Sequence, residues 1–451
     1  MSDYVLVTHW TGGDVYPFIR LGKMLRKEGH QVTILTHCVY EEKARAAGLD
    51  FVALDTLDEY QNMNRDLAML ADPIGHKENY LLFHKRYHGK DRLLHEVKLI
   101  DKVCTSDSII VARFRSSISG MLVAEKNHLR YASMILAPNY FSHMELHNQL
   151  FGKAFCDEIN PAREALHLPL ITNWKDWLYS PKTILCGWPE WYAERDETWA
   201  DGATPIGFLS DNEKEDEVKI SQEIEDFIDQ AHKANRKIAI VTGGSSRMVS
   251  KDFYRTGIHS CEKDGVYTIA VTPYDEYVPD EVSDIVKCVR YAPLRVLMKK
   301  VDLVVHHGGM GTINEAIDAA ASQVILPHLT DGPDNADRLA ALGIATKFPP
   351  KLWNSEEISK SIKKQLEDRN RELCLRYREM NQHTYDEKLW KETLLNLEAY
   401  TLPEQKVNPV AEPGQKEKAA GDPENALPKK HLSREMLMKL MKKKQESKSE
   451  Q

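Results

Sequence analysis

Short apolar runs alternate with longer stretches of helical spacing along the first two hundred residues. The runs are continuously apolar instead of alternating with polar residues: YVLV (4–7), QVTIL (31–35), DFVAL (50–54), SIIVA (108–112) and RYASMILA (130–137). Continuous apolar strands separated by helices are typical of a parallel sheet that is buried on both faces. The pattern therefore predicts a doubly wound α/β domain over residues 1–210, of the Rossmann-like kind.

The same alternation restarts after an acidic connector, LSDNEKEDEVK (209–219), which offers no core positions. The next apolar runs are KIAIVTGG (237–244), YTIAVT (267–272), DLVVHH (302–307) and QVILPH (323–328), and they predict a second doubly wound domain over 220–370. Residues 371–400 are amphipathic without a strand signal, so we expect a long helix. Residues 401–451 are rich in Lys, Glu, Pro and Gln, and we expect them to be disordered.

Composition narrows the class of protein. Of 451 residues, 42% are apolar, which suffices for sizeable cores, and the net charge of -8 argues against a nucleic-acid partner. The sequence contains no uninterrupted run of about 18 apolar residues, so we expect no membrane-spanning helix. Seven scattered cysteines without a Cys-x-x-Cys pair are typical of free thiols in a reducing compartment. Because the N-terminus also lacks a signal-peptide pattern, we expect a cytoplasmic protein.

Two doubly wound domains in one chain commonly hold a ligand at the carboxyl ends of their strands. One loop there, HHGGMGT (306–312), follows an apolar run and begins a helix. Unpaired N–H groups at a helix start attract anions, and glycines let a bulky anion approach them. His307 and Thr312 can donate to a diphosphate, and Glu315 can accept from ribose hydroxyls. The alternative is an ordinary tight turn with Thr312 as its cap.

A second loop, PHLTDGPDNADRLAALG (327–343), again follows a strand and precedes a helix. Together the two loops resemble the signature of family 1 glycosyltransferases, which transfer sugar from a nucleotide diphosphate. The N-terminal stretch TGGDVYPFIRLGKMLRKEGHQVTILT (11–36) is similar to the opening of that family's acceptor domain. The resemblance extends to about residue 400 and is to the bacterial members that act on natural products. It implies the GT-B fold, in which two Rossmann-like domains face a cleft and the last helix crosses back to the first domain.

Residue by residue, the resemblance implies a donor site in the second domain. The diphosphate would be bound by His307, Gly309, Gly311 and Thr312, and the ribose by Glu315. Pro293 would lie against the base, and Asp331 would hold hydroxyls of the donor sugar. Gly332 departs from the family's usual glutamine, which puts the identity of the sugar in doubt. The remaining positions assigned to the donor site are in Gly-rich loops, namely Gly13, Gly243 and Ser245.

The resemblance also places Asp14 where bacterial relatives carry the catalytic base. An aspartate is a weak base toward an alcohol, but it can act if the proton transfers only as the C–O bond forms. His9, at the end of the first strand, is the rival base, and a structural hydrogen bond is its more conventional role. No Asp-x-Asp motif occurs in the sequence, so we expect no metal and no cofactor. A base on the acceptor side and a leaving group held opposite it imply a single displacement, which inverts the configuration at the anomeric carbon.

The residues that would bind the acceptor are harder to identify from the sequence. Aromatic residues gather between 174 and 199, and we expect most of them to be core instead of pocket lining: Trp174, Trp177, Tyr179, Trp188, Trp191, Tyr192 and Trp199. Residues 60–100 carry several basic side chains that could face an acidic acceptor, although a solvated face is the preferred reading: His76, His84, Arg86, His88 and Arg92.

The leading hypothesis is an inverting transferase that uses a UDP- or dTDP-sugar and a hydroxyl of a small lipophilic acceptor. A non-catalytic partner that binds nucleotide sugars is the alternative, with Gly332 as the only feature in its favour. A sugar-nucleotide epimerase ranks lower, since epimerases lack the N-terminal acceptor loop. A basic amphipathic segment at 433–444 could touch anionic lipid or a partner, although disorder is the preferred expectation.

Overall fold

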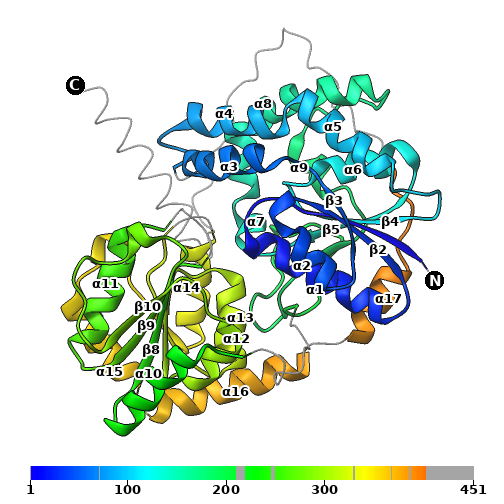
Figure 1. Cartoon of the computed structure of the whole chain (residues 1–451). Coiled ribbons are helices and arrows are strands. Elements are labelled where there is room, and N and C mark those ends of the chain that lie inside the picture. The colour runs from blue at the N-terminus through cyan, green and yellow to red at the C-terminus, as the bar shows by residue number, and fades with distance from the viewer. Residues whose placement is uncertain are drawn as a thin grey trace, which may run out of the picture. The chain divides into compact units, whose positions relative to one another are not determined.

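Two separate parallel sheets organise the chain (Figure 1). The computed structural model describes residues 2–70, 72–209, 219–244, 249–328, 331–366, 368–384 and 387–402. We call the part around the seven-stranded sheet the first lobe and the part around the six-stranded sheet the second lobe. The two sheets confirm the predicted α/β fold with two Rossmann-like domains.

The sheet of the first lobe has the strand order β3-β2-β1-β4-β5-β6-β7, with every neighbouring pair parallel. Its strands are β1 (Asp3–Val7), β2 (Gln31–Thr36), β3 (Asp50–Ala53), β4 (Ile109–Arg113), β5 (Arg130–Ile135), β6 (Ile184–Cys186) and β7 (Ala203–Pro205). The helices of this lobe are α1 (Gly12–Lys27), α2 (Glu41–Ala46), α3 (Leu57–Asp66), α4 (Lys77–His88), α5 (Lys90–Asp101), α6 (Ile118–Asn127), α7 (Asn139–Ser142), α8 (Met144–Ala165) and α9 (Trp174–Tyr179).

The sheet of the second lobe has the order β10-β9-β8-β11-β12-β13 and is also parallel throughout. Its strands are β8 (Ile238–Thr242), β9 (Tyr267–Val271), β10 (Val286–Val289), β11 (Leu303–His306), β12 (Ser322–Ile325) and β13 (Ala345–Lys347). The helices here are α10 (Gln222–Lys233), α11 (Lys251–Glu262), α12 (Leu294–Leu297), α13 (Met310–Asp318), α14 (Gly332–Ala341), α15 (Ser355–Gln365) and α16 (Asp368–Thr384).

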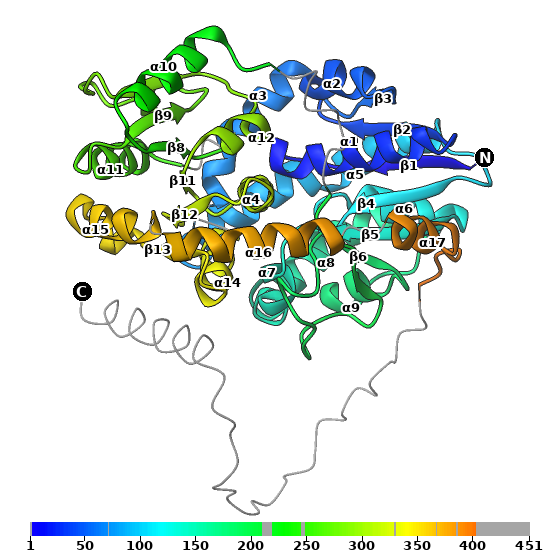
Figure 2. The same ribbon diagram turned by 90° about the horizontal axis from the view of Figure 1, so that it is seen from below.

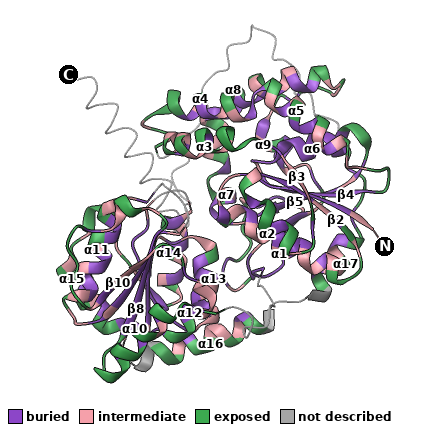
Figure 3. Cartoon of the chain, viewed as in Figure 1, coloured by how far each residue is buried: buried purple, intermediate pink, exposed green. Residues whose placement is uncertain are grey.

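Burial on both faces explains why the apolar runs are continuous. In β4 and β8 every residue is buried, and Figure 3 shows the central strands of both sheets in the colour for buried residues. Since helices cover both faces, a polar side chain on these strands would have no access to water. Polar residues therefore collect where the strands end, and that is where the candidate site lies.

The C-terminal return to the first lobe is made by two helices instead of one. After α16, which packs against α13, the helix α17 (Glu387–Leu395) lies against the first lobe (Figure 2). The Trp390 side chain is fully buried among core residues of that lobe, and its Nε1 donates to the Ile206 carbonyl at 2.7 Å. The predicted crossing thus exists, and its anchor is an indole ring.

Several other predictions from the sequence do not concern a particular helix or strand. The seven cysteines, all within the described residues, are free. None of the helices in the described residues is both long and apolar enough to cross a membrane. The basic segment at 433–444 and most of the acidic connector fall outside the described residues. The domain boundaries proposed from the sequence stay predictions.

Candidate active site

The loop after β11 approaches the loop after β12 so closely that both need glycine. Gly308 has φ +92°, a conformation that disfavours side chains, and a Cβ there would lie 2.9 Å from the Gly332 carbonyl oxygen. A Cβ on Gly332 would in turn lie 2.7 Å from the carbonyl oxygen of His307. The glycine that departs from the family pattern is therefore accounted for by the contact between these two loops.

The His307 ring lies between two glycine loops. A Cβ on Gly309 would lie 2.5 Å from its Nε2, and a Cβ on Gly244, in the loop after β8, would lie 2.9 Å from its Cε1. Burial lowers the pKa of His307 to about 4 and outweighs a hydrogen bond with the Thr242 backbone, so the ring is neutral at pH 7. Its Nδ1 is buried without a partner among the described residues. A buried nitrogen of this kind is unusual in a structure and is suited to a ligand.

The same end of the second lobe carries the other predicted donor residues. Gly309 is the N-cap of α13, Thr312 is buried in its first turn, and no atom of the described residues is recorded within 4 Å of a Cβ built on Gly311. This helix start is therefore lined by glycine and open. Pro293 is the N-cap of α12, which packs against α13. Gly243, in the loop after β8, donates its N–H to the Tyr254 hydroxyl, whereas Ser245 lies outside the described residues.

Asn335 holds the second loop together, a role that the loop sequence PHLTDGPDNADRLAALG (327–343) does not reveal. Its side chain is fully buried, and its Nδ2 donates to the Gly308 carbonyl at 2.8 Å and to Asp331 Oδ2 at 2.9 Å. Its Oδ1 accepts from the hydroxyl of Tyr192, a first-lobe residue, at 2.9 Å. One amide thus positions the proposed sugar-binding Asp331 relative to both the glycine loop and the first lobe.

Glu315 is the second point where the lobes meet. Its Oε1 accepts from Arg20 Nη2, on α1 of the first lobe, at 2.8 Å, and the two side chains are 11% and 20% exposed. Arg20 also donates to the Leu209 carbonyl at 3.1 Å. The pair leaves Oε2 of Glu315 for a further donor, such as a ribose hydroxyl. It also connects the donor site to a residue of the first lobe that the sequence did not single out.

Asp14 occupies the first turn of α1, directly after the predicted Gly13. Its Oδ2 accepts from the backbone N–H and the hydroxyl of Thr11, each at 3.1 Å, which forms a capping box. Its Oδ1 pairs with Arg113 Nη2 at 2.6 Å, and this arginine comes from the end of β4. These contacts hold the Asp14 carboxylate in place, and 18% of its side chain is exposed.

His9 is more enclosed, with 5% of its side chain exposed. Its Nδ1 lies 2.8 Å from the Ser117 hydroxyl, and its Nε2 lies 3.0 Å from Glu96 Oε1. Arg92 donates to the same Glu96 oxygen at 2.7 Å. Because both ring nitrogens are engaged inside the protein, His9 has no nitrogen left for an acceptor hydroxyl. Of the two candidate bases, Asp14 is the accessible one.

The polar residues of the first lobe divide between surface and interior. As expected, His76 and the Arg86 side chain are exposed. The solvated-face reading is wrong for His88, which is 7% exposed, and for His84, which is half-buried, because α8 covers this side of α4. Among the aromatic residues the core reading is confirmed for Trp177, Trp188 and the other buried members, Trp174, Tyr192 and Trp199.

Two family models match the chain. The model described as the glycosyltransferase family 28 N-terminal domain covers residues 4–141, and the one described as erythromycin biosynthesis protein CIII-like, C-terminal domain, covers residues 268–391. The first match lies in the lobe with Asp14. The second spans the loops with His307 and Gly332.

The curated relatives and the solved structures that resemble the chain are also glycosyltransferases. Sterol 3-beta-glucosyltransferases of Vanderwaltozyma polyspora and Pichia angusta are 24% and 22% identical over 422 and 414 residues, or 82% and 80% of this chain. The chain spans about a third of their length, 32% and 30%. The glycotransferase of kitacinnamycin has a TM-score of 0.67 at 16% identity and covers 87% of this chain and 99% of its own.

A further solved structure, the glycosyltransferase VinC in complex with DTDP, has a TM-score of 0.66 at 16% identity over 87% of this chain and 98% of its own. At such identities the structural likeness speaks for the fold alone. The family assignment comes from the two matched models, which lie in the order of the two lobes. With the glycine loops where β8, β11 and β12 end, they identify the chain as a family 1 glycosyltransferase with the GT-B fold.

Proposed function

We propose that this chain transfers a sugar from a UDP- or dTDP-sugar to a hydroxyl of a small lipophilic acceptor, with inversion at the anomeric carbon. The observation that carries the proposal is the neutral His307 ring between Gly244 and Gly309, whose buried Nδ1 has no hydrogen-bond partner in the part of the chain that the structure describes. A diphosphate would supply both the negative charge and the oxygen atoms for which this arrangement is suited.

In the proposed reaction, the helix start and His307 stabilise the charge that develops on the departing nucleoside diphosphate. Because these protein groups stabilise the charge that a metal ion stabilises in other transferases, the proposed reaction requires no metal ion. Asp331, oriented by Asn335 Nδ2 at 2.9 Å, would hold hydroxyls of the sugar. Glu315 would accept from the ribose with its second oxygen while Arg20 fixes the first.

Asp14 is the proposed base. It would take the proton of the acceptor hydroxyl as the new C–O bond forms, on the face of the sugar opposite the departing diphosphate. The contact with Arg113 holds the carboxylate in place before the acceptor arrives. Attack and departure on opposite faces constitute a single displacement, which inverts the anomeric configuration.

The relatives support the choice of substrates only in outline. Curated relatives are named for glucosyl transfer to a sterol, and one structural neighbour is described with DTDP, so a lipophilic acceptor and either nucleotide are consistent with them. Gly332 carries no argument for a non-catalytic partner, since its lack of a side chain follows from the close approach of His307.

The test begins with calorimetric titration of the protein with UDP and dTDP. Incubation with UDP- and dTDP-hexoses and hydroxylated acceptors follows, with products detected by mass spectrometry and the anomer assigned by NMR. Transfer with inversion is expected. Retention would refute the single displacement, and nucleotide binding without any product would favour a non-catalytic partner.

A pair of variants tests the ribose contact. Glu315→Gln should weaken UDP binding more than dTDP binding, because a ribose offers one more hydroxyl to the carboxylate than a deoxyribose does. Glu356→Gln, at an exposed carboxylate paired with Lys263 on the surface of the second lobe, is the matched control and should bind both nucleotides normally. Equal losses for UDP and dTDP in Glu315→Gln would remove Glu315 from the ribose site.

A further inference from the structure

Hydrogen bonds join three neighbouring loops at the carboxyl edge of the first sheet. Strands β3, β2 and β1 lie side by side, and Asp55, His37 and Trp10 follow them in that order. Asp55 Oδ2 lies 2.6 Å from His37 Nδ1, and the Trp10 N–H donates to His37 Nε2 at 2.8 Å. The His37 ring therefore connects the loop after β3 to the loop after β1.

The Trp10 N–H fixes the state of the His37 ring. A backbone N–H can only donate, so Nε2 accepts and carries no proton, while Nδ1 carries the proton that is donated to Asp55. Asp55 is also held at its other oxygen, because Oδ1 accepts from the Cys38 N–H at 2.9 Å. The His37 and Asp55 side chains are 3% and 2% exposed. Burial lowers the pKa of His37, so the ring that accepts from Trp10 is neutral at pH 7.

The bond to Trp10 replaces the next backbone bond of the sheet. The Thr8 N–H still donates to the Leu35 carbonyl of β2 at 3.1 Å. Bonds in a parallel pair are evenly spaced, at every second residue, so an extended chain would next join the Trp10 N–H to the His37 carbonyl. Instead Trp10 has φ +83°, in the left-handed region that a bulky residue seldom adopts. The His37 side chain thus takes the place of its own carbonyl and holds a strained turn.

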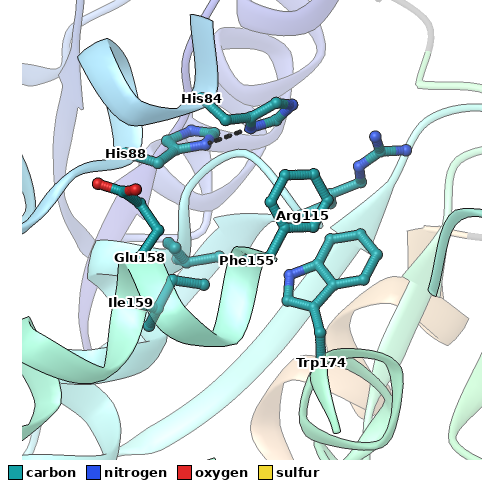
Figure 4. Close-up of a pocket in the computed structure, with 8 residues that line it drawn as sticks. His84, His88, Arg115, Phe155, Glu158, Ile159 and Trp174 are labelled. Atoms are coloured by element: carbon teal, nitrogen blue, oxygen red, sulfur yellow. Dashed lines mark hydrogen bonds between the residues drawn. The ribbon is translucent and has the colours of Figure 1, made fainter. Parts of the chain in front are cut away.

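The side chain of Trp10 is held as well. Its indole packs against Phe83 and His88 of α4, with ring centroids 5.2 Å and 5.5 Å apart. Figure 4 shows His88 joined in turn to His84, one turn earlier in α4, by a bond of 3.1 Å between their Nδ1 atoms. With its indole and its N–H both fixed, the turn at Trp10 is over-determined. Strain that is maintained in this way is concentrated at functional sites.

The strained turn lies directly before the proposed base. The next residue, Thr11, is the N-cap of α1, and its N–H and hydroxyl both donate to Asp14 Oδ2 at 3.1 Å. Because the Thr11 N–H belongs to the peptide group that joins Trp10 to Thr11, a rotation of the Trp10 backbone would redirect this donor. The Asp14 carboxylate would then lose one of the bonds that orient it. Through this single peptide group, His37 acts on Asp14.

We infer that His37, oriented by Asp55, is a positioning residue for sugar transfer: it holds the Trp10 turn, and the turn holds the Asp14 carboxylate toward the acceptor hydroxyl. This inference rests on the proposed function, because it concerns the base of the same transferase. His37 is assigned no contact with a substrate, since both of its ring nitrogens are engaged within the protein.

Two amide variants separate the two bonds of the ring. The side-chain amide of glutamine reaches the position of a histidine Nε2, whereas the shorter amide of asparagine reaches that of Nδ1. His37→Gln can therefore still accept from Trp10, while His37→Asn can still donate to Asp55 but leaves the Trp10 N–H without its acceptor. If His37 positions the turn, glutamine is the better replacement; if it only serves Asp55, asparagine is.

Hydrogen exchange followed by mass spectrometry reports on the turn itself. In the full chain, His37→Asn should speed exchange in peptides that cover residues 8–15, and His37→Gln should do so less. His30 provides the matched control, since its Nδ1 also accepts a backbone N–H, from Ser2 at 3.1 Å, but directly before β2. His30→Gln displaces that acceptor and should leave exchange at 8–15 unchanged. Unchanged exchange in His37→Asn would overturn the inference.

Transfer rates test the connection to Asp14. UDP-glucose and dTDP-glucose are offered as donors, with cholesterol and 2-naphthol as acceptors. His37→Asn should lower kcat about 10- to 100-fold, as expected when a reacting group is misplaced by about 1 Å. Its affinity for UDP and dTDP should not change, because the nucleotide is bound by the second lobe. His37→Gln should retain more of the rate, and His30→Gln should retain all of it.

Combination with Asp14→Asn separates positioning from a general loss of stability. Once the base is removed its position no longer matters, so Asp14→Asn with His37→Asn should have the kcat of Asp14→Asn alone. Asp55→Ala, which frees the ring to leave Trp10, should show the same non-additive loss and is the second variant if His37→Asn does not fold. Losses that multiply in the double variants would show that His37 acts independently of Asp14 and would overturn the inference.

Failure here and failure of the proposed function can be told apart. If Asp14→Asn lowers kcat but His37→Asn does not, the transferase stands and the inference falls. If the unaltered chain transfers no sugar while hydrogen exchange changes as expected, the proposed function falls, and His37 holds a turn that positions no base.

Discussion

Adding a side chain at Gly332 should damage the donor site, although the family's usual residue at this position is glutamine. A Cβ on Gly332 would lie 2.7 Å from the His307 carbonyl oxygen, and one on Gly308 would lie 2.9 Å from the Gly332 oxygen. Unstrained carbon–oxygen contacts lie at about 3.3 Å or more. Both partners are backbone atoms, so no flexible side chain can move aside. The two loops would have to separate by roughly half an ångström.

The magnitude follows from the cost of overpacking. Forcing a carbon atom into a closely packed region typically costs about 1–3 kcal/mol. If the cost is expressed in donor binding, the affinity for UDP or dTDP falls about 5- to 150-fold. The His307 ring would be displaced with its backbone, because Gly244 and Gly309 leave it no alternative space.

The assay compares Gly332→Ala and Gly332→Gln with the unaltered protein by calorimetry with UDP and dTDP and by thermal unfolding. Gly311→Ala is the control for folding, because a Cβ at that position would meet none of the described residues within 4 Å, and its melting temperature should not fall. If Gly332→Gln binds the donor as well as the unaltered chain or turns over faster, the position has room for a side chain and the reasoning is refuted.

Three further predictions concern the base, the phosphate site and the C-terminus. Asp14→Asn should lower kcat about 10²–10⁴-fold and leave the nucleotide affinity unchanged. If Asp14→Asn keeps full kcat while His9→Ala has no activity, the base is His9 and not Asp14. Since the pKa of His307 is about 4 in the free protein, a bound diphosphate should raise it, so binding takes up protons and strengthens as pH falls toward that value. Calorimetry in buffers of different ionisation enthalpy should detect the uptake, and His307→Gln should abolish it and cost ~1.5–3 kcal/mol. Trp390→Ala should cost about 3–5 kcal/mol of unfolding free energy, whereas truncation after Leu402 should leave the melting temperature unchanged.

Local sequence pattern sufficed for the architecture and for one half of the candidate site. Strands such as β4 and β8 are continuously apolar because both faces of a parallel sheet are covered, and that requirement is visible in a few consecutive residues. The glycine loop after β11 could be found for the same reason. Its residues are adjacent in the chain, and a helix start that faces an anion needs glycine within a single turn.

The partners of those residues are a matter of tertiary structure. Glu315 pairs with Arg20, 295 positions away, and the bonds that His9 makes to Ser117 and Glu96 span 108 and 87 positions. No local pattern encodes such pairs, since each depends on how the helices pack against two sheets. The need for glycine at position 332 arises in the same way, from the approach of another loop.

Burial of the basic groups shows the difference most clearly. His84 and His88 are four residues apart, so the sequence places them on one face of a helix, but a solvated face and a buried face have the same spacing. The packing of α8 against α4 decides between them. The sequence by itself determined that two parallel sheets end in polar loops; only the folded chain determined which charges are paired, which are buried and which remain for a ligand, because the field at a charged group is set by neighbours in space and not in sequence.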